Sequence, residues 1–196
     1  MNRNDFIVAL QQQLEPNIVR HSFAVEACME GLYDYLQSQG RITASEPDKT
    51  DWLLAGLIHD CDFGGEFKAE HPAHTRDMLK KYNLEISDTV LNIVKAHAPE
   101  LTGYAPQNLA EWSIFCVDSL TGLITAVAYV YPSRKIADVK VSSVLKRFLK
   151  EPKFAAGTRR NEVAMCEKAD GLNIPLEKFI EISLTSMQRI APALEL

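Results

Sequence analysis

Apolar residues recur every three or four positions along most of this chain, which is the spacing of one face of an α-helix. The pattern predicts helices over residues 2–14, 17–39, 51–60, 71–82, 88–98, 109–131, 141–150, 161–169 and 175–190. Prolines lie at several of the breaks, and Asn17 is the expected cap of the second helix. No segment alternates apolar and polar residues as a half-buried strand does. The predicted fold class is therefore all-α.

The predicted helix over 51–60 has an unusual end. Its apolar run is followed directly by His59 and Asp60. A buried carboxylate without a partner costs several kcal/mol, so we expect a cation beside it. Side chains of adjacent helical residues point about 100° apart, so both can reach one ion only where the helix ends. Gly64 and Gly65 are expected to supply that end.

Histidines and one carboxylate also stand at the inner faces or ends of other predicted helices. These residues are His21, His71, His97 and Asp118. Asp118 lies in the middle of the apolar helix over 109–131, where it has poor access to water and needs a cation. A single residue of this kind usually belongs to an ordinary core, but the whole set suits Mn, Fe, Zn, Ni or Mg. The pattern indicates a divalent metal site.

In chain order, these residues resemble the HD domain superfamily of metal-dependent phosphohydrolases. That family has His, then His-Asp, then Asp on successive helices, which here are His21, His59-Asp60 and Asp118. The segment 71–79 is similar to the HPxxGAxxL-type element of members with two metals, although Thr75 stands where glycine is usual. His97 resembles the companion ligand of that element. The tail over 117–146 also resembles a bacterial subfamily of predicted HD hydrolases.

The resemblance implies an HD-domain helical bundle with a core over about 17–131 and a C-terminal helical extension over 133–196. It also implies one or two divalent ions, with Asp60 shared between them. The first would be held by His21, His59, Asp60 and Asp118, and the second by Asp60, His71 and His97. Metal-activated water would attack phosphorus, as in a phosphomonoesterase or phosphodiesterase. Asp60 and His74 are candidate catalytic residues, and a solvent-facing His74 is the simpler interpretation of that histidine.

Two other functions stay open on the sequence. The same order of ligands supports HD-type di-iron oxygenases, such as those that resemble inositol oxygenase. A catalytically silent module that binds a nucleotide is a third interpretation. No GYP signature follows the segment 71–79, which argues against a cyclic dinucleotide substrate.

Length and composition bound these predictions. With 196 residues, 46% of them hydrophobic, the chain is expected to form a single domain over 1–196 around one core. Its four cysteines lie far apart in the sequence, which indicates reduced thiols. We see no leader peptide and no apolar run close to the roughly 20 residues of a membrane span. A cytoplasmic protein without a membrane partner is therefore expected.

Charge is spread unevenly along the chain. Residues 133–160 hold nine Lys and Arg and two acidic residues, a net charge of +7 that leaves −12 on the remainder. Lys140, Lys146 and Arg159 are the candidate contacts for a substrate phosphate, and a solvated outer face would explain the same charges. Aromatic residues are not interleaved with the basic ones, so no nucleic acid partner is expected. The expected partner is a small phosphorylated substrate, and the oligomeric state stays open.

Overall fold

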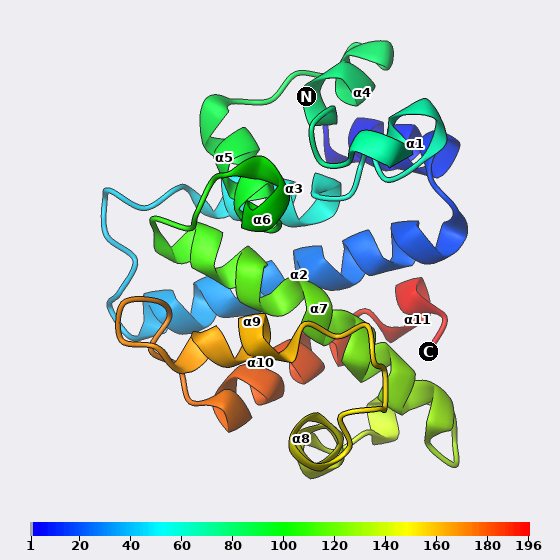
Figure 1. Cartoon of the computed structure of the whole chain (residues 1–196), viewed down its shortest axis with the longest axis vertical. Helices are drawn as coiled ribbons and strands as arrows, with labels where there is room; N and C mark the ends of the chain where they lie inside the picture. Colours follow the sequence, from blue (N-terminus) through cyan, green and yellow to red (C-terminus); the bar gives the residue numbers. More distant parts are fainter. Residues whose placement is uncertain (1) are drawn as a thin grey trace.

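Residues 2–196 are described by a computed structural model, which shows a bundle of helices (Figure 1). This part of the chain contains no β-strand, so the predicted all-α class is confirmed. The helices are α1 (Arg3–Gln13), α2 (Pro16–Ser38), α3 (Lys49–Ile58), α4 (Thr75–Lys81), α5 (Asp88–Ala96), α6 (Pro99–Thr102), α7 (Leu109–Val130), α8 (Val141–Lys150), α9 (Arg160–Ala164), α10 (Leu176–Arg189) and α11 (Ala191–Leu194). Short 3-10 helices are η1 (Gly65–Glu70), η2 (Ile136–Asp138) and η3 (Met165–Glu167).

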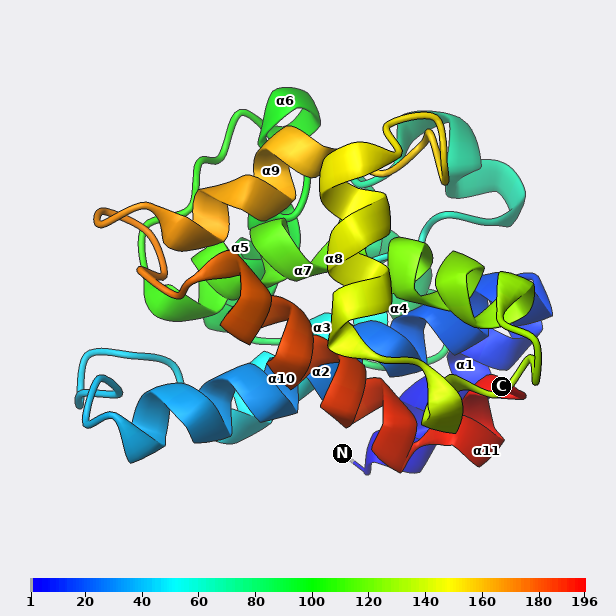
Figure 2. The ribbon, with the colours of Figure 1, turned by 90° about the horizontal axis from the view of Figure 1, so that it is seen from below.

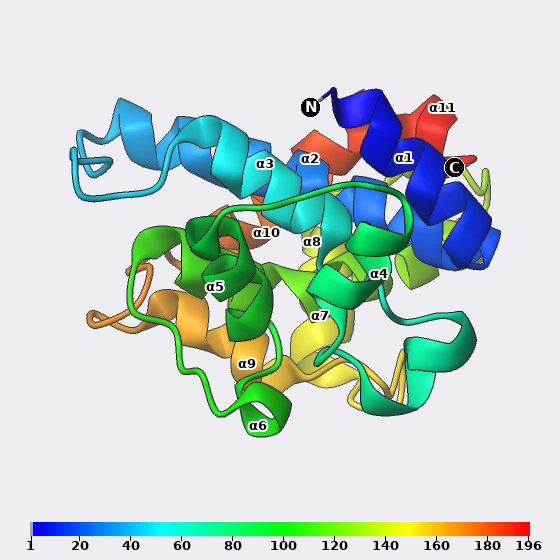
Figure 3. The same cartoon turned by 90° about the horizontal axis from the view of Figure 1, so that it is seen from above.

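Helix α2 lies at the centre of the bundle (Figure 1). It packs against α3 and α7, and α5 packs against both of these helices, so the four close into a ring. Figure 3 shows α3 and α5 on the side of the molecule that also carries α4. The ring is held by fully buried side chains such as Leu32, Ile58, Ile93 and Leu120. Burial of each one stabilises the fold by roughly 1.5 to 3 kcal/mol.

The C-terminal helices share this core. Helix α10 packs on α2, and α8 packs on both α7 and α10 (Figure 2). The α2–α10 contact is close at Gly31, where a Cβ atom would lie 2.1 Å from the hydroxyl oxygen of Ser186. In the same contact the thiol of Cys28 donates to the carbonyl of Ser183 at 3.5 Å. Glycine and small residues therefore let the C-terminal half rest directly on the central helix.

Three predicted boundaries are wrong. Helix α2 begins at Pro16, with Glu15 as its cap, because proline suits the first turn of a helix; Asn17 lies inside it. The segment that starts at His71 does not open α4, which begins only at Thr75. Residues 71–74 form turns instead, since the backbone N–H of His74 donates to a buried carboxylate outside the helix. The helix predicted over 161–169 is divided into α9 and η3.

Helix α7 also corrects one expectation. Its 22 residues are long and apolar enough to cross a membrane by length and composition alone, so an apolar run of that size does exist. The helix is nevertheless mostly buried, and α2, α5, α8, α9 and α10 pack around it, as around the core helix of a globular domain. Gly122 in this helix is not needed for close packing, because no atom of another element lies within 4 Å of the Cβ position there.

Candidate metal centre

The end of α3 brings the His-Asp pair against α2. At Gly56 the two helices approach so closely that a Cβ atom would lie 2.9 Å from the Cα of Glu26. The chain then turns at once, because the N–H of Cys61 donates to the carbonyl of Ile58 at 2.9 Å. His59 is the C-cap of α3 and is fully buried. Helix packing thus carries its imidazole directly to the inner side of α2.

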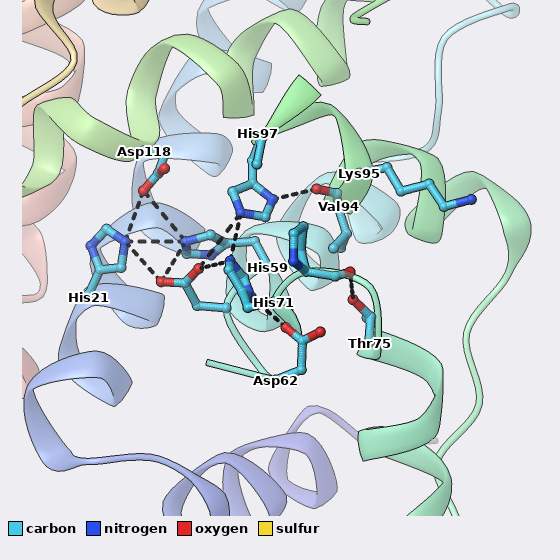
Figure 4. Close-up of polar contacts among 12 residues, drawn as sticks. His21, His59, Asp62, His71, Thr75, Val94, Lys95, His97 and Asp118 are labelled. Carbon is cyan, nitrogen blue, oxygen red and sulfur yellow. Dashed lines mark hydrogen bonds and ion pairs between the residues drawn. The ribbon is translucent and has the colours of Figure 1, made fainter. Parts of the chain in front are cut away.

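Six residues selected from the sequence lie together in two groups of three (Figure 4). The first group is His21, His59 and Asp118, and the second group is Asp60, His71 and His97. Within each group, one ligand atom from each residue lies within 4.8 Å of the others. The six residues come from α2, from the end of α3 and the turn after it, from the segment before α4, from the end of α5 and from α7. The fold therefore gathers side chains that are up to 97 positions apart.

Asp60 lies between the two groups, with one carboxylate oxygen towards each. Its Oδ2 lies 3.7 Å from Nε2 of His21 and 3.5 Å from Nε2 of His59. Its Oδ1 lies 3.3 Å from Nε2 of His71 and 3.8 Å from Nε2 of His97. A carboxylate in this position can be shared by two cations.

Two of the four imidazoles are oriented by helix carbonyls. The Nδ1–H of His59 donates to the carbonyl of Gly56 at 2.9 Å, and that of His97 donates to the carbonyl of Val94. Both acceptors lie three residues earlier in the chain, on the last turn of the same helix. These bonds place the proton on Nδ1 and turn the Nε2 lone pair towards the centre, which is the usual arrangement of a metal-bound histidine.

The other two imidazoles are oriented by side chains. The hydroxyl of Thr121 donates to the carbonyl of Asp118 at 2.8 Å, so its oxygen accepts from Nδ1–H of His21 at 3.0 Å. The carboxylate of Asp62, which is fully buried, accepts from Nδ1–H of His71 at 2.6 Å. All four histidines therefore direct Nε2 inward (Figure 4).

The inward nitrogens meet in pairs. Nε2 of His21 lies 3.2 Å from Nε2 of His59, and Nε2 of His71 lies 3.3 Å from Nε2 of His97. With the protons on Nδ1, each pair would bring two lone pairs together, which is unfavourable without a cation between them. A metal ion about 2.1 Å from two nitrogens holds them roughly 3.0 to 3.4 Å apart. The donor set and its spacing therefore fit a divalent cation in each group.

The carboxylates make the histidines basic in the absence of an ion. Burial disfavours the charged form of His59, but Asp60 and Asp118 together outweigh it and raise the pKa of that imidazole to about 9. The pKa of His71 is likewise raised to about 9, against burial, by Asp60 and Asp62. Burial and the charge of His59 lower the pKa of His97 to about 4. A metal ion therefore has to displace protons from the first two of these rings.

The two carboxylates of the site respond in the opposite direction. Burial alone would raise the pKa of Asp60, but the imidazoles of His59, His71 and His21 hold it well below its usual range. The pKa of Asp118 is lowered in the same way, mainly by His21 and His59. Both groups are thus ionised at neutral pH and supply the negative charge that a cation requires.

Comparison with known protein families matches residues 18–123, more than half of the chain, to the HD domain. The protein belongs to the HD domain family. This family includes metal-dependent phosphohydrolases, and its members bind divalent metals. No curated protein and no solved structure gave a match.

One residue from beyond the matched HD segment reaches the centre. Arg159 donates from Nη2 to Oδ2 of Asp118 at 2.7 Å, while Oδ1 of the same carboxylate lies 2.9 Å from Nε2 of His21. The guanidinium also pairs with Glu162 at 2.6 Å and lies 3.8 Å from Glu100. Arg159 is therefore surrounded by three carboxylates and fixes the outer oxygen of Asp118.

The other proposed phosphate contacts lie on or beside α8. The side chain of Lys146 is 66% exposed and lies 3.7 Å from Glu151. Lys140 is exposed at the cap of the same helix. Among the described residues, no hydrogen bond or ion pair joins either lysine to the six candidate ligands, so of the three only Arg159 is bonded to the HD site.

His74 stands at the cap of α4 beside the site. Its Nδ1 lies 2.8 Å from a carboxylate oxygen of Asp77, and its Nε2 lies 3.0 Å from one of Glu70. These two carboxylates raise the pKa of the imidazole. Both ring nitrogens are thus engaged by surface residues, and its catalytic role stays a prediction.

Sequence reasoning missed the roles of Asp62 and Thr121. Asp62 orients His71 and accepts a hydrogen bond from the N–H of His74 at 2.8 Å. The available signal was a second carboxylate two positions after the HD pair. For Thr121 the available signal was its spacing of three residues from Asp118, which places both on one face of α7.

Proposed function

We propose that this HD-domain protein is a metal-dependent phosphohydrolase that acts on a small phosphorylated metabolite or nucleotide. The observation that carries the proposal is the position of Asp60, whose two oxygens face two separate pairs of imidazole nitrogens. A pair of cations that shares a carboxylate can stabilise both the attacking and the leaving oxygen of an in-line displacement at phosphorus. Membership of the HD family supports the same chemistry.

The two groups would hold one ion each, with Asp60 shared. His21, His59 and Asp118 would bind the first, and His71 and His97 the second. When bound, such ions act as Lewis acids towards a phosphoryl oxygen and lower the pKa of coordinated water.

Exposure indicates the side from which a substrate reaches the ligands. The side chains of His59 and His97 are 0% and 3% exposed, whereas those of His21 and Asp60 are 22% and 16% exposed. The buried pair closes the back of the site, and the other pair leaves the front accessible. A catalytic metal site keeps an open position of this kind, whereas a structural site is closed.

The chain's own groups then have distinct tasks in the reaction. The acceptors Gly56, Val94, Thr121 and Asp62 keep the four Nε2 lone pairs in place. Arg159 holds Oδ2 of Asp118 and places positive charge beside that ligand. Preorganised charge of this type stabilises the charge that builds on a transferring phosphoryl group.

The direct test is a metal and substrate screen. Metal-free protein would be loaded in turn with Mn, Fe, Co, Ni, Zn and Mg and incubated with a panel of phosphate monoesters, diesters and nucleotides. We expect phosphate or nucleoside release with at least one ion, and loss of that release in Asp60→Asn. Full occupancy by two ions with no hydrolysis of any member of the panel would overturn the proposal.

The shared carboxylate also suits two iron ions, so an HD-type oxygenase is the second candidate. Anaerobic purification followed by iron analysis and oxygen-uptake measurement distinguishes the two functions. Oxygen uptake that depends on an organic phosphate or polyol, without phosphate release, would favour the oxygenase. Nucleotide binding with neither reaction would favour a regulatory module.

A further inference from the structure

A groove of about 580 Å³ opens next to His71, one of the second-group residues. It lies between the segment before α4, helix α5 and helix α6. Its walls include Pro72, Leu91, Leu101 and the side chain of Lys95. Because His71 lies in its wall, the groove borders the second group.

Lys95 brings an unneutralised charge to this groove. It stands on α5 two residues before His97, and its side chain extends away from the ligand cluster (Figure 4). Among the described residues, its ammonium group has no hydrogen bond or ion pair, although its backbone carbonyl accepts from Thr102 at 2.9 Å. Lys95 is half-buried as a residue, and an ammonium group without a partner favours an anion in its surroundings.

The other charged residues that line the groove are already paired. Arg76 donates to Asp88 at 2.6 Å, and Glu70 lies 3.0 Å from the ring of His74. Lys95 is therefore the cation with which a bound molecule can pair at no loss of an existing contact.

The groove also has an apolar wall. The side chain of Leu101 is 64% exposed, although it is large and apolar. Together with Leu91 and Pro72 it borders the space between His71 and Lys95. A largely uncharged molecular body placed there would cover this surface and gain hydrophobic stabilisation.

We propose that the groove binds the part of the substrate beyond the scissile phosphate, and that Lys95 pairs with a second acidic group on it. The inference rests on the proposed function, because it assumes a phosphate at the metal site. It specifies the substrate class: a phosphate ester that carries a second phosphate or a carboxylate, separated from the scissile phosphate by an uncharged body.

The test uses non-hydrolysable molecules of graded length. Zinc-loaded protein would be titrated calorimetrically with alkane bisphosphonates of increasing chain length, with ω-carboxyalkyl phosphonates and with the matched monoalkyl phosphonates. At one chain length we expect a bisphosphonate or a carboxyphosphonate to bind roughly tenfold or more tightly than its monophosphonate, the scale of one charge-assisted hydrogen bond. Comparison of the two series identifies the second acidic group.

Two variants test whether this gain in affinity arises in the groove. In Lys95→Met, the bisphosphonate or carboxyphosphonate should bind no more tightly than its monophosphonate. The metal content of this variant should equal that of the unaltered protein. Lys146→Met removes the same charge from the exposed face of α8 and should keep the gain. A gain that survives Lys95→Met, or no gain at any chain length, overturns the inference. Failure of the monophosphonates themselves to bind the metal-loaded protein overturns the proposed function, and the inference with it.

Discussion

The first and second ligand groups are held by different parts of the molecule. The first stands on α2, at the end of α3 and in the middle of α7, and α2 packs directly against both of the other helices. In the second group, His97 caps α5, but Asp60 and His71 lie in the turns between α3 and α4. Core packing thus places the first group, whereas the second depends on a buried carboxylate, Asp62, that holds its surrounding turn.

The largest effect is expected at the residue that both groups share. Asp60→Ala removes the one carboxylate with an oxygen towards each pair of imidazoles, so both ions should be lost. Activity should fall by more than the roughly 10- to 100-fold typical of an outer-sphere partner. Metal analysis and phosphate release measure the two losses, and circular dichroism should show unchanged helix content. Full metal content in this variant would rule out the shared role, and Asp138→Ala, at an exposed carboxylate away from the six ligands, is the matched control.

Removing one histidine from each group separates the two positions. His97→Ala should reduce the stoichiometry from two ions to one, because Nε2 of His97 lies 3.3 Å from Nε2 of His71 and 3.8 Å from Asp60, both in the second group. His21→Ala should instead disturb the first position and spare the second. Elemental analysis of fully loaded protein gives the counts. If the unaltered protein never holds more than one ion, the two-ion site is wrong, and His71 and His97 become candidate substrate contacts.

Removing a residue that orients a histidine should reduce metal affinity more in the second group than in the first. Asp62 accepts two hydrogen bonds, one with each carboxylate oxygen, whereas an amide has a single acceptor oxygen. In Asp62→Asn, the NH2 group of the amide therefore faces either Nδ1–H of His71 or the N–H of His74, and two donors cannot bond to each other. Affinity for the second ion should fall about 10- to 100-fold. Thr121→Val removes the acceptor of His21 while nearly keeping its shape. Because helix packing still positions His21, the loss at the first ion should be smaller, about tenfold or less.

Competition titrations with a chelator measure both affinities. Equal losses in the two variants would show that helix packing does not protect the first group, and the contrast between the groups would fail. A loss confined to the first ion in Asp62→Asn would contradict the assignment of His71 to the second.

The sequence predicted the long helices, though not the short α6 and α11, and it predicted the six residues that gather. Apolar periodicity marks α2, α3, α5 and α7, and the order of His and Asp resembles the HD family. The sequence could not predict the turn over 71–74 or the role of Asp62. Both depend on a buried carboxylate that meets its partners only after the chain has folded. The long α7 shows the same limit, because a run apolar enough for a membrane is covered here by other helices.

The basic segment illustrates why charge counts alone do not locate a binding surface. Its net charge of +7 suggested a wall of cations at the site, yet Lys146 is 66% exposed on α8 and pairs with Glu151. Arg159 lies in the loop before α9, which packs on α7, and this contact brings its guanidinium to Asp118. The position of a charge was set by helix packing, which composition does not describe.

The smallest effects are therefore expected along this segment, and they should be unequal. Arg159→Met removes the charge that fixes Oδ2 of Asp118, so kcat/KM should fall roughly tenfold, the scale of one charge-assisted hydrogen bond of about 1.5 to 3 kcal/mol. Arg159→Lys keeps the charge but loses the planar fork that serves several carboxylates, so it should recover only part of the rate. Lys140→Met and Lys146→Met should change kcat/KM less than about twofold, since both lysines are exposed and neither is bonded to the six candidate ligands. Steady-state kinetics on metal-loaded protein decides the matter: a loss at Lys146 as large as that at Arg159 would mean that α8 faces the substrate after all.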